Sequence, residues 1–148
     1  MKLKTDQRRD KQSFALRTNI WLLSRLDCIW SNHFPDINQT NKVFIKFGRY
    51  SKLRLGSIKM ARHGGHTVIT ITKMFQDSKI SVDVVDQTIG HELVHYAHGF
   101  SSPYPKMHRY PHEGGIVKKE MISRGLGKQV RAYQNWVKVY RRELYDKS

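Results

Sequence analysis

Residues 82–99 read VDVVDQTIGHELVHYAHG, and this stretch decides how the rest of the chain is interpreted. Apolar residues recur along one side at helical spacing: Val82, Val85, Ile89, Leu93 and Ala97. This period predicts an amphipathic helix. Ser81 or Asp83 can cap its start, and Gly99 can close its end. Gly90 leaves room for close packing beside the helix.

The helix carries the motif His91-Glu92-Leu93-Val94-His95. Residues four positions apart lie on one helix face, with Cβ atoms about 5–6 Å apart, so His91 and His95 direct two imidazoles at one point. Neutral imidazole nitrogen is a good zinc ligand. Glu92 follows the first histidine, so its carboxylate can take a proton from a zinc-bound water and pass it to a leaving amine. The motif therefore predicts one catalytic Zn²⁺ and hydrolysis of peptide bonds, with Glu92 as general base.

A hydrolytic zinc site needs a third protein ligand and an open position for water. The metzincin spacing would need Gly at position 98 and His at position 101, where this chain has His98 and Ser101. His98 lies on the same helix as the two motif histidines and would not easily complete a tetrahedron with them. The third ligand is therefore expected farther along the chain. The candidates are His112, which we favour, and then Glu120, His108 and Glu113.

The first half of the chain predicts a helix followed by a small sheet. The helix spans residues 14–30, with Arg17 and Arg25 on its wet side. Its inward residues are expected to be Leu16, Ile20, Leu23, Leu26 or Asp27, and Trp30. Alternating or β-branched patterns predict three strands, at 43–47, 52–62 and 66–72, in a largely antiparallel sheet. Gly64-Gly65 is expected to form a two-residue hairpin turn.

Two further helices are predicted after the motif helix. Pro111 suits the first position of a helix that runs to about residue 124. The last helix, residues 128–144, is expected to point five residues inward: Val130, Tyr133, Val137, Tyr140 and Leu144. The predicted fold is therefore α+β and zincin-like. Residues 1–12 are expected to form a flexible basic N-terminus, and residues 13–148 a single domain.

The composition is globular but strongly basic. The 148 residues include 27 Lys and Arg against 12 Asp and Glu, which gives a net charge of +15. Such a charge attracts polyanions, of which nucleic acid is the commonest. The single cysteine, Cys28, excludes an internal disulfide and a cysteine-based zinc site. No signal peptide or membrane-spanning segment is recognisable. We therefore expect a monomer inside the cell, cytoplasmic or nucleoid-associated, with no membrane role.

The region from Val43 to Gly127 resembles the SprT-like, or Spartan-type, zinc metallopeptidases. The matching segments are Leu53-Arg54-Leu55-Gly56-Ser57, the HELVH helix at 91–95, and Pro111-His112 followed by a helix to Leu126-Gly127. The resemblance implies His91, His95 and His112 as zinc ligands and Glu92 as general base. This chain reads His112-Glu113-Gly114 where family members commonly read His-Gly, and it has no C-terminal four-cysteine zinc ribbon.

For that family, the implied activity is proteolysis of proteins bound or crosslinked to DNA, with single-stranded or damaged DNA as activator. The positive charge of this chain agrees with such a partner. The basic residues expected to contact phosphates are Lys46, Arg49, Lys52, Arg54, Lys138, Arg141 and Arg142. Tyr50, Trp136 and Tyr140 could stack on bases, although burial in the core is the commoner role of aromatic residues.

Two other interpretations of the sequence remain. One is a zinc peptidase without a nucleic-acid role, whose activity would not respond to DNA. The other is a non-catalytic nucleic-acid-binding protein with a structural metal site, for which Glu92 would serve no purpose. The sequence does not identify the group that stabilises the oxyanion of a bound peptide; Tyr104, Tyr110 and His108 are the candidates.

Overall fold

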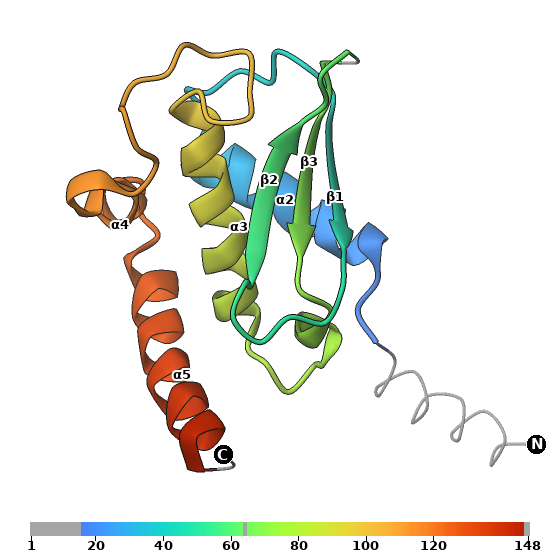
Figure 1. Cartoon of the computed structure of the whole chain (residues 1–148), viewed down its shortest axis with the longest axis vertical. Helices are drawn as coiled ribbons and strands as arrows, with labels where there is room; N and C mark the ends of the chain where they lie inside the picture. Colours follow the sequence, from blue (N-terminus) through green and yellow to red (C-terminus); the bar gives the residue numbers. More distant parts are fainter. Residues whose placement is uncertain (1–15, 64, 147–148) are drawn as a thin grey trace, which may run out of the picture.

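A computed structural model describes residues 16–63 and 65–146 (Figure 1). Its helices are α2 (Asn19–His33), α3 (Val82–Ala97), α4 (Ile116–Ser123) and α5 (Gly127–Asp146), and its strands are β1 (Val43–Phe47), β2 (Gly56–Met60) and β3 (Thr67–Ile71). Two short 3₁₀ helices, η1 (Lys73–Gln76) and η2 (Glu113–Gly115), precede α3 and α4. The α+β prediction is confirmed. The predicted flexible segment 1–12 lies outside the described residues.

The sheet is mixed rather than largely antiparallel. Its strand order is β1-β3-β2, so β3 lies between the two strands that precede it in the chain. β2 pairs with β3 antiparallel, but β1 pairs with β3 in parallel, from Val43 opposite Thr67 to Phe47 opposite Ile71. The prediction was wrong for the β1–β3 pair because an alternating pattern identifies a strand without naming its neighbours.

The connection between β2 and β3 is also longer than a two-residue turn. The Ala61 N–H donates to the His66 carbonyl at 2.8 Å, so the loop lies between these two residues. Gly65 adopts a φ of +65°, which glycine accepts without strain. Gly64 is outside the described residues.

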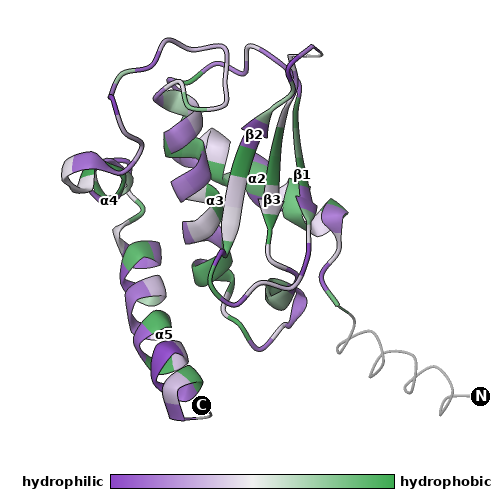
Figure 2. Ribbon diagram, viewed as in Figure 1, coloured by the Kyte–Doolittle hydropathy of each residue, from purple (hydrophilic) through white to green (hydrophobic). Residues whose placement is uncertain are grey.

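Helix α3 lies at the centre of the molecule. It contacts α2, α4, α5, β2 and β3, and it is buried along most of its length. In Figure 2 most of β1 is hydrophobic and β2 is largely pale or hydrophilic, whereas α5 alternates between hydrophilic and hydrophobic residues. The last helix therefore packs one face against α3 and leaves the other in water. Among the described residues, no helix is both long enough and apolar enough to cross a membrane.

The inward face of α2 agrees with the prediction at Leu26, which is buried, and at Trp30, which packs against the core, but differs elsewhere. The buried residues are Leu22, Leu26 and Ile29. The predicted inward residues Leu16, Ile20 and Leu23 are 60%, 81% and 46% exposed. The helix begins at Asn19, because the Thr18 side chain accepts a hydrogen bond from the Trp21 N–H and caps the first turn. Two apolar stripes at helical spacing run along this segment, and the period alone does not choose between them.

The two arginines of this region are not simply in water. Arg25 donates to the Asp86 carboxylate on α3 at 2.9 and 2.7 Å. Arg17 donates to the carbonyls of Phe75 and Ile80 at 3.2 and 2.6 Å. The prediction that both lie on the wet side was wrong. Arg25 joins α2 to α3, and Arg17 joins the residues just before α2 to the segment that precedes α3.

The ends of α3 follow the sequence signals. The Ser81 side chain accepts from the Val84 N–H, which caps the start. Gly99 has a φ of +81°, and a Cβ there would lie 2.3 Å from the Pro105 carbonyl oxygen. Gly99 therefore lets the chain leave α3 and pass close to its own backbone.

The predicted helix from Pro111 begins later. Gly114 and Gly115 have φ values of 62° and 67°, so the α-helical conformation starts only at Ile116. The prediction placed the start too early because it weighed the proline and not the two glycines. The last helix is confirmed; Val130 is buried, and the other predicted inward residues are half-buried: Tyr133, Val137, Tyr140 and Leu144.

Candidate metal centre

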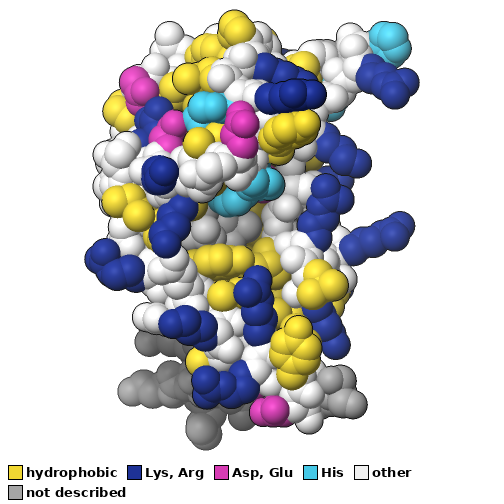
Figure 3. Space-filling view, turned by 60° about the vertical axis from the view of Figure 1, so that its left-hand side comes forward, with side chains coloured by type: hydrophobic (Ala, Val, Ile, Leu, Met, Phe, Trp, Pro, Cys, Tyr) yellow, Lys and Arg dark blue, Asp and Glu magenta, His cyan; other side chains and the backbone are white. Residues whose placement is uncertain are grey.

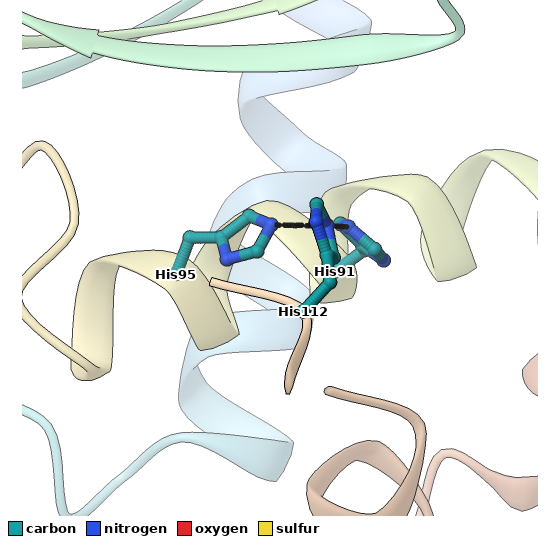
Figure 4. Close-up of side chains that lie close together, drawn as sticks. All are labelled: His91, His95 and His112. Atoms are coloured by element: carbon teal, nitrogen blue, oxygen red, sulfur yellow. Dashed lines mark hydrogen bonds between the residues drawn. The ribbon is translucent and has the colours of Figure 1, made fainter. Parts of the chain in front are cut away.

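Three histidine side chains meet at one point (Figure 4). His91 and His95 come from α3, and His112 comes from the segment just before η2. Their Nε2 atoms are 3.0 Å apart for His91–His112, and 3.1 Å apart for His95–His91 and for His95–His112. Within the part of the chain that the structure describes, this is the one group of three or more His, Cys, Asp or Glu placed to hold a metal ion.

The three nitrogens cannot satisfy one another. Each Nε2 is either a hydrogen-bond donor or an acceptor. At least two of the three must therefore have the same role, and their contact is not a hydrogen bond. A cation resolves this conflict, because it takes a lone pair from every ring. At a zinc–nitrogen distance of about 2.0–2.1 Å, tetrahedral ligands lie roughly 3.3 Å apart, close to the spacing here.

The histidine environment favours neutral rings. Burial, and next the neighbouring His112, lowers the pKa of His91 to about 4. Burial, together with the adjacent histidines, lowers the pKa of His95 to about 3. At physiological pH these rings are uncharged, and metal binding requires that form.

Glu92 lies beside this cluster with a free carboxylate oxygen. Its side chain is 4% exposed, and its Oε2 has no hydrogen-bond partner among the described residues. Burial raises the pKa of Glu92 to about 7, although the positive charge of Arg54 acts in the opposite direction. A carboxyl group with a pKa near neutrality can both accept and release a proton, as a general base and acid must.

Gly56, the first residue of β2, leaves space over that carboxylate. A Cβ at Gly56 would lie 2.8 Å from Thr88 Cγ2 and 3.6 Å from Glu92 Oε1. The absent side chain therefore keeps the approach to Glu92 open. Gly56 belongs to a segment that the sequence marked, but its role depends on the packing of β2 against α3.

The cluster opens into a cleft of about 570 Å³. Residues 53–58 form one wall, and the α3 residues Gln87, Thr88 and Glu92 form the opposite wall. Phe100, Ser101 and Tyr133 complete the lining. Figure 3 shows histidine side chains in the middle of this face, above a hollow lined by hydrophobic side chains and bordered by Lys and Arg. The three imidazoles can thus be reached through this cleft.

The other proposed ligands lie elsewhere. His98 Nε2 is 2.6 Å from Glu120 Oε1, so these two residues pair with each other. His108 Nδ1 lies 3.7 Å from Glu113 Oε1. The structure therefore brings His112, and none of those four residues, to His91 and His95.

The seven predicted basic contacts are all exposed, and six of them form two groups. Arg49, Lys52 and Arg54 lie between β1 and β2, whereas Lys138, Arg141 and Arg142 lie on α5. The Tyr140 hydroxyl donates to the Lys52 carbonyl at 3.0 Å and joins the two groups. Arg54 also lines the cleft, and Lys46 lies apart from it on β1.

Of the three aromatic residues considered for base stacking, one is exposed and two are packed in the protein. Tyr50 is 58% exposed. Trp136 and Tyr140 pack against the hydrophobic core, with their rings stacked at 4.7 Å.

Tyr133 is the tyrosine that the sequence analysis missed at this site. It was predicted only as an inward residue of the last helix, yet it lines the cleft beside His112. Tyr104 instead donates to the Asn38 carbonyl at 2.6 Å, and Tyr110 packs under Arg109, so neither lines the cleft. Helical spacing pointed Tyr133 inward, and nothing in the sequence indicated that this interior faces the metal centre.

Comparisons with known proteins add no relative. No protein-family model, no curated protein and no solved structure matches this chain.

Proposed function

We propose that this protein is a zinc-dependent endopeptidase of SprT-like type. The observation that carries the proposal is the convergence of three imidazole nitrogens, at 3.0–3.1 Å, beside the unpartnered oxygen of Glu92. His91, His95 and His112 would hold the ion. Bound there, zinc supplies Lewis-acid chemistry at its open coordination position.

Glu92 performs the proton transfers. Its Oε2 is buried and has no protein donor, and the residue lines the cleft. The carboxylate would accept a proton from the attacking water and then deliver it to the amide nitrogen of the leaving strand. A structural metal site has no use for a buried carboxylate at this position, because burying an unpaired acid costs free energy.

The edge of β2 provides a docking strand for an extended peptide. The Thr72 N–H donates to the Leu55 carbonyl and the Ala61 N–H to the His66 carbonyl, so these residues form hydrogen-bonded pairs with the β3 side. In an antiparallel pair, the intervening residues Gly56 and Ile58 direct their backbone groups to the opposite edge. There the Ile58 carbonyl already accepts from the Ser101 hydroxyl at 3.1 Å. That edge borders the cleft. Strand addition of this kind binds a backbone with little dependence on its sequence.

The substrate class that we propose is protein bound or crosslinked to DNA. It is supported by the net charge of +15 and by exposed arginine and lysine side chains on both sides of the cleft. Arg54 lines the cleft itself, and Lys52 is joined to α5 through Tyr140. DNA held along these groups would bring an attached protein to the metal centre.

The test is a cleavage assay with zinc-loaded protein and a loosely folded basic protein, with and without single-stranded DNA. Glu92→Gln keeps the shape of the side chain but removes the base. Glu143→Gln, at an exposed position on α5, is the matched control. We expect cleavage by the unaltered protein and the control, stimulated by DNA, and none by Glu92→Gln.

Cleavage that does not respond to DNA would remove the nucleic-acid part of the proposal. Full cleavage by Glu92→Gln would contradict the peptidase mechanism. Bound zinc without cleavage in any sample would favour a structural metal site.

A further inference from the structure

A second pocket lies on the other side of the metal centre. It has a volume of about 240 Å³ and shares Gln87, His91, His112 and Tyr133 with the cleft. Its walls come from α4 and α5 rather than from β2. The two cavities therefore meet at two of the three imidazoles.

Part of this second pocket is apolar, while Gln87 and Gln134 also line it. Val117, Met121 and Val130 are 4%, 2% and 4% exposed, and all three line it. His112 and Lys118 also line it and are exposed, so the pocket opens to solvent and is not a closed packing void. An apolar pocket open at one end can take a side chain from outside.

We propose that this pocket binds one aliphatic side chain of the substrate, of leucine or methionine size, next to the peptide bond that is cleaved. The inference rests on the proposed peptidase function, since the scissile bond must lie at the metal centre. It adds a preference that the backbone contacts along β2 cannot supply. Val117, Met121 and Val130 would be its specificity-determining residues.

The chemistry of the walls selects against positively charged side chains. A cation placed among the two valines and Met121 would lose its hydration and meet Lys118, which also lines the pocket, whereas an isobutyl group gains by leaving water. The volume is smaller than that of an ordinary small-molecule site, which favours a single side chain over a larger ligand. Full burial of a leucine side chain corresponds to roughly 10- to 100-fold in affinity, and a pocket open at one end to about tenfold.

The test measures binding, so it does not depend on turnover. Two neutral hydroxamates that differ only by an isobutyl group are titrated calorimetrically into the zinc-loaded full chain. We expect the isobutyl compound to bind about tenfold more tightly. Val117→Phe fills the pocket and should abolish the preference. Met121→Ala enlarges it and should shift the preference toward a benzyl-bearing hydroxamate.

Met74→Ala is the matched control, because Met74 is 8% exposed and lines neither cavity. Zinc content and thermal unfolding of each variant show whether it is folded. If Val117→Phe does not fold, the hydroxamate preference of Met121→Ala, compared with that of Met74→Ala, still tests the proposal.

Equal binding of both hydroxamates by the unaltered protein would overturn the pocket proposal while leaving the peptidase proposal in place. An equal shift in Met74→Ala would also overturn it. A clear isobutyl preference without any peptide cleavage would support the pocket and count against the proposed function. Absence of hydroxamate binding to zinc-loaded protein would end both, because no open metal position would exist.

Discussion

His95 and His98 lie less than one helical turn apart at the end of α3, and the protein treats them differently. Both are almost completely buried, at 5% and 2% exposed. His98 Nε2 meets the Glu120 carboxylate at 2.6 Å. His95 Nε2 meets only the Nε2 atoms of His91 and His112, at 3.1 Å.

On the His98 side, a chain of hydrogen bonds continues from the Nε2 atom to the surface. Glu120 also accepts from Arg124 at 3.1 Å, and Arg124 in turn donates to Asp36 at 2.6 Å. Opposite charges and donor–acceptor pairs alternate along it. At His95 the neighbouring nitrogens have no such complement. The comparison shows that a histidine's partner, rather than its burial, separates a ring paired within the protein from one that could hold a metal ion.

The largest expected effect comes from removing one histidine of the cluster formed by His91, His95 and His112. Outer partners of metal ligands typically contribute 10–100-fold in affinity, so loss of the ligand itself in His112→Ala should weaken zinc binding by more than about 100-fold. All activity should disappear with the metal. Zinc content after gel filtration, with His108→Ala as control, measures this. Full zinc retention in His112→Ala would contradict the assignment of His112.

The second-largest effect is expected for Glu92→Gln, which tests catalysis separately from metal binding. Glu92→Gln should retain zinc, because Glu92 is not one of the three converging groups. Loss of the base should lower kcat by about 10²–10⁴-fold. Parallel zinc analysis and cleavage kinetics measure both quantities. Loss of zinc in this variant would show that Glu92 is a ligand.

The His98 side should respond in stability and not in metal binding. Glu120→Ala leaves both ring nitrogens of His98 without a partner, since its Nδ1 already has none among the described residues. This should cost about 1–3 kcal/mol in the free energy of unfolding, with zinc content unchanged. Denaturant unfolding, with Lys119→Ala as the exposed neighbouring control, provides the measurement. If Glu120→Ala lost zinc and kept its stability, His98 and Glu120 would belong to the metal site and not to a separate structural network.

The smallest effect lies at the outer end of the same network. The hydrogen bond from Arg124 holds the pKa of Asp36 below its ordinary value of 3.8. The stabilisation is therefore present above pH 3.8 and is lost as the pH falls through the lower, folded-state pKa. Because this ion pair is exposed, it should be worth only about 0.5 kcal/mol. Asp36→Asn should match the unaltered protein in strong acid and be slightly less stable near neutrality. An equal difference at both pH values would exclude this origin.

The sequence predicted the elements better than their arrangement. Period and caps located α3 closely, because Ser81, Gly99 and the apolar spacing are local signals. The parallel pairing of β1 with β3 and the inward face of α2 were not predictable in this way. Both depend on which element packs against which, and a single sequence does not state that.

In the candidate site, too, local signals were predictable and tertiary contacts were not. His91, Glu92 and His95 share one helix, so their spacing was sufficient to group them. His112 was one of several candidates, and only the fold distinguishes it from Glu120, which pairs with His98. For Tyr133, the sequence indicated only that its side chain points inward from the last helix. Its position in the cleft depends on the contact of α5 with α3.

The segment that carries His112 has one further consequence, which concerns the order of folding and metal capture. After Gly99 it is anchored to the end of α3: the Ser102 hydroxyl donates to the Tyr96 carbonyl at 2.6 Å, and the Met107 N–H to the His98 carbonyl at 3.0 Å. The conformational entropy of this segment is therefore lost when the chain folds and not when an ion arrives. In zinc fingers, by contrast, the ion itself orders the chain. We expect this protein to take up its ion as a rigid receptor, with an unchanged circular dichroism spectrum.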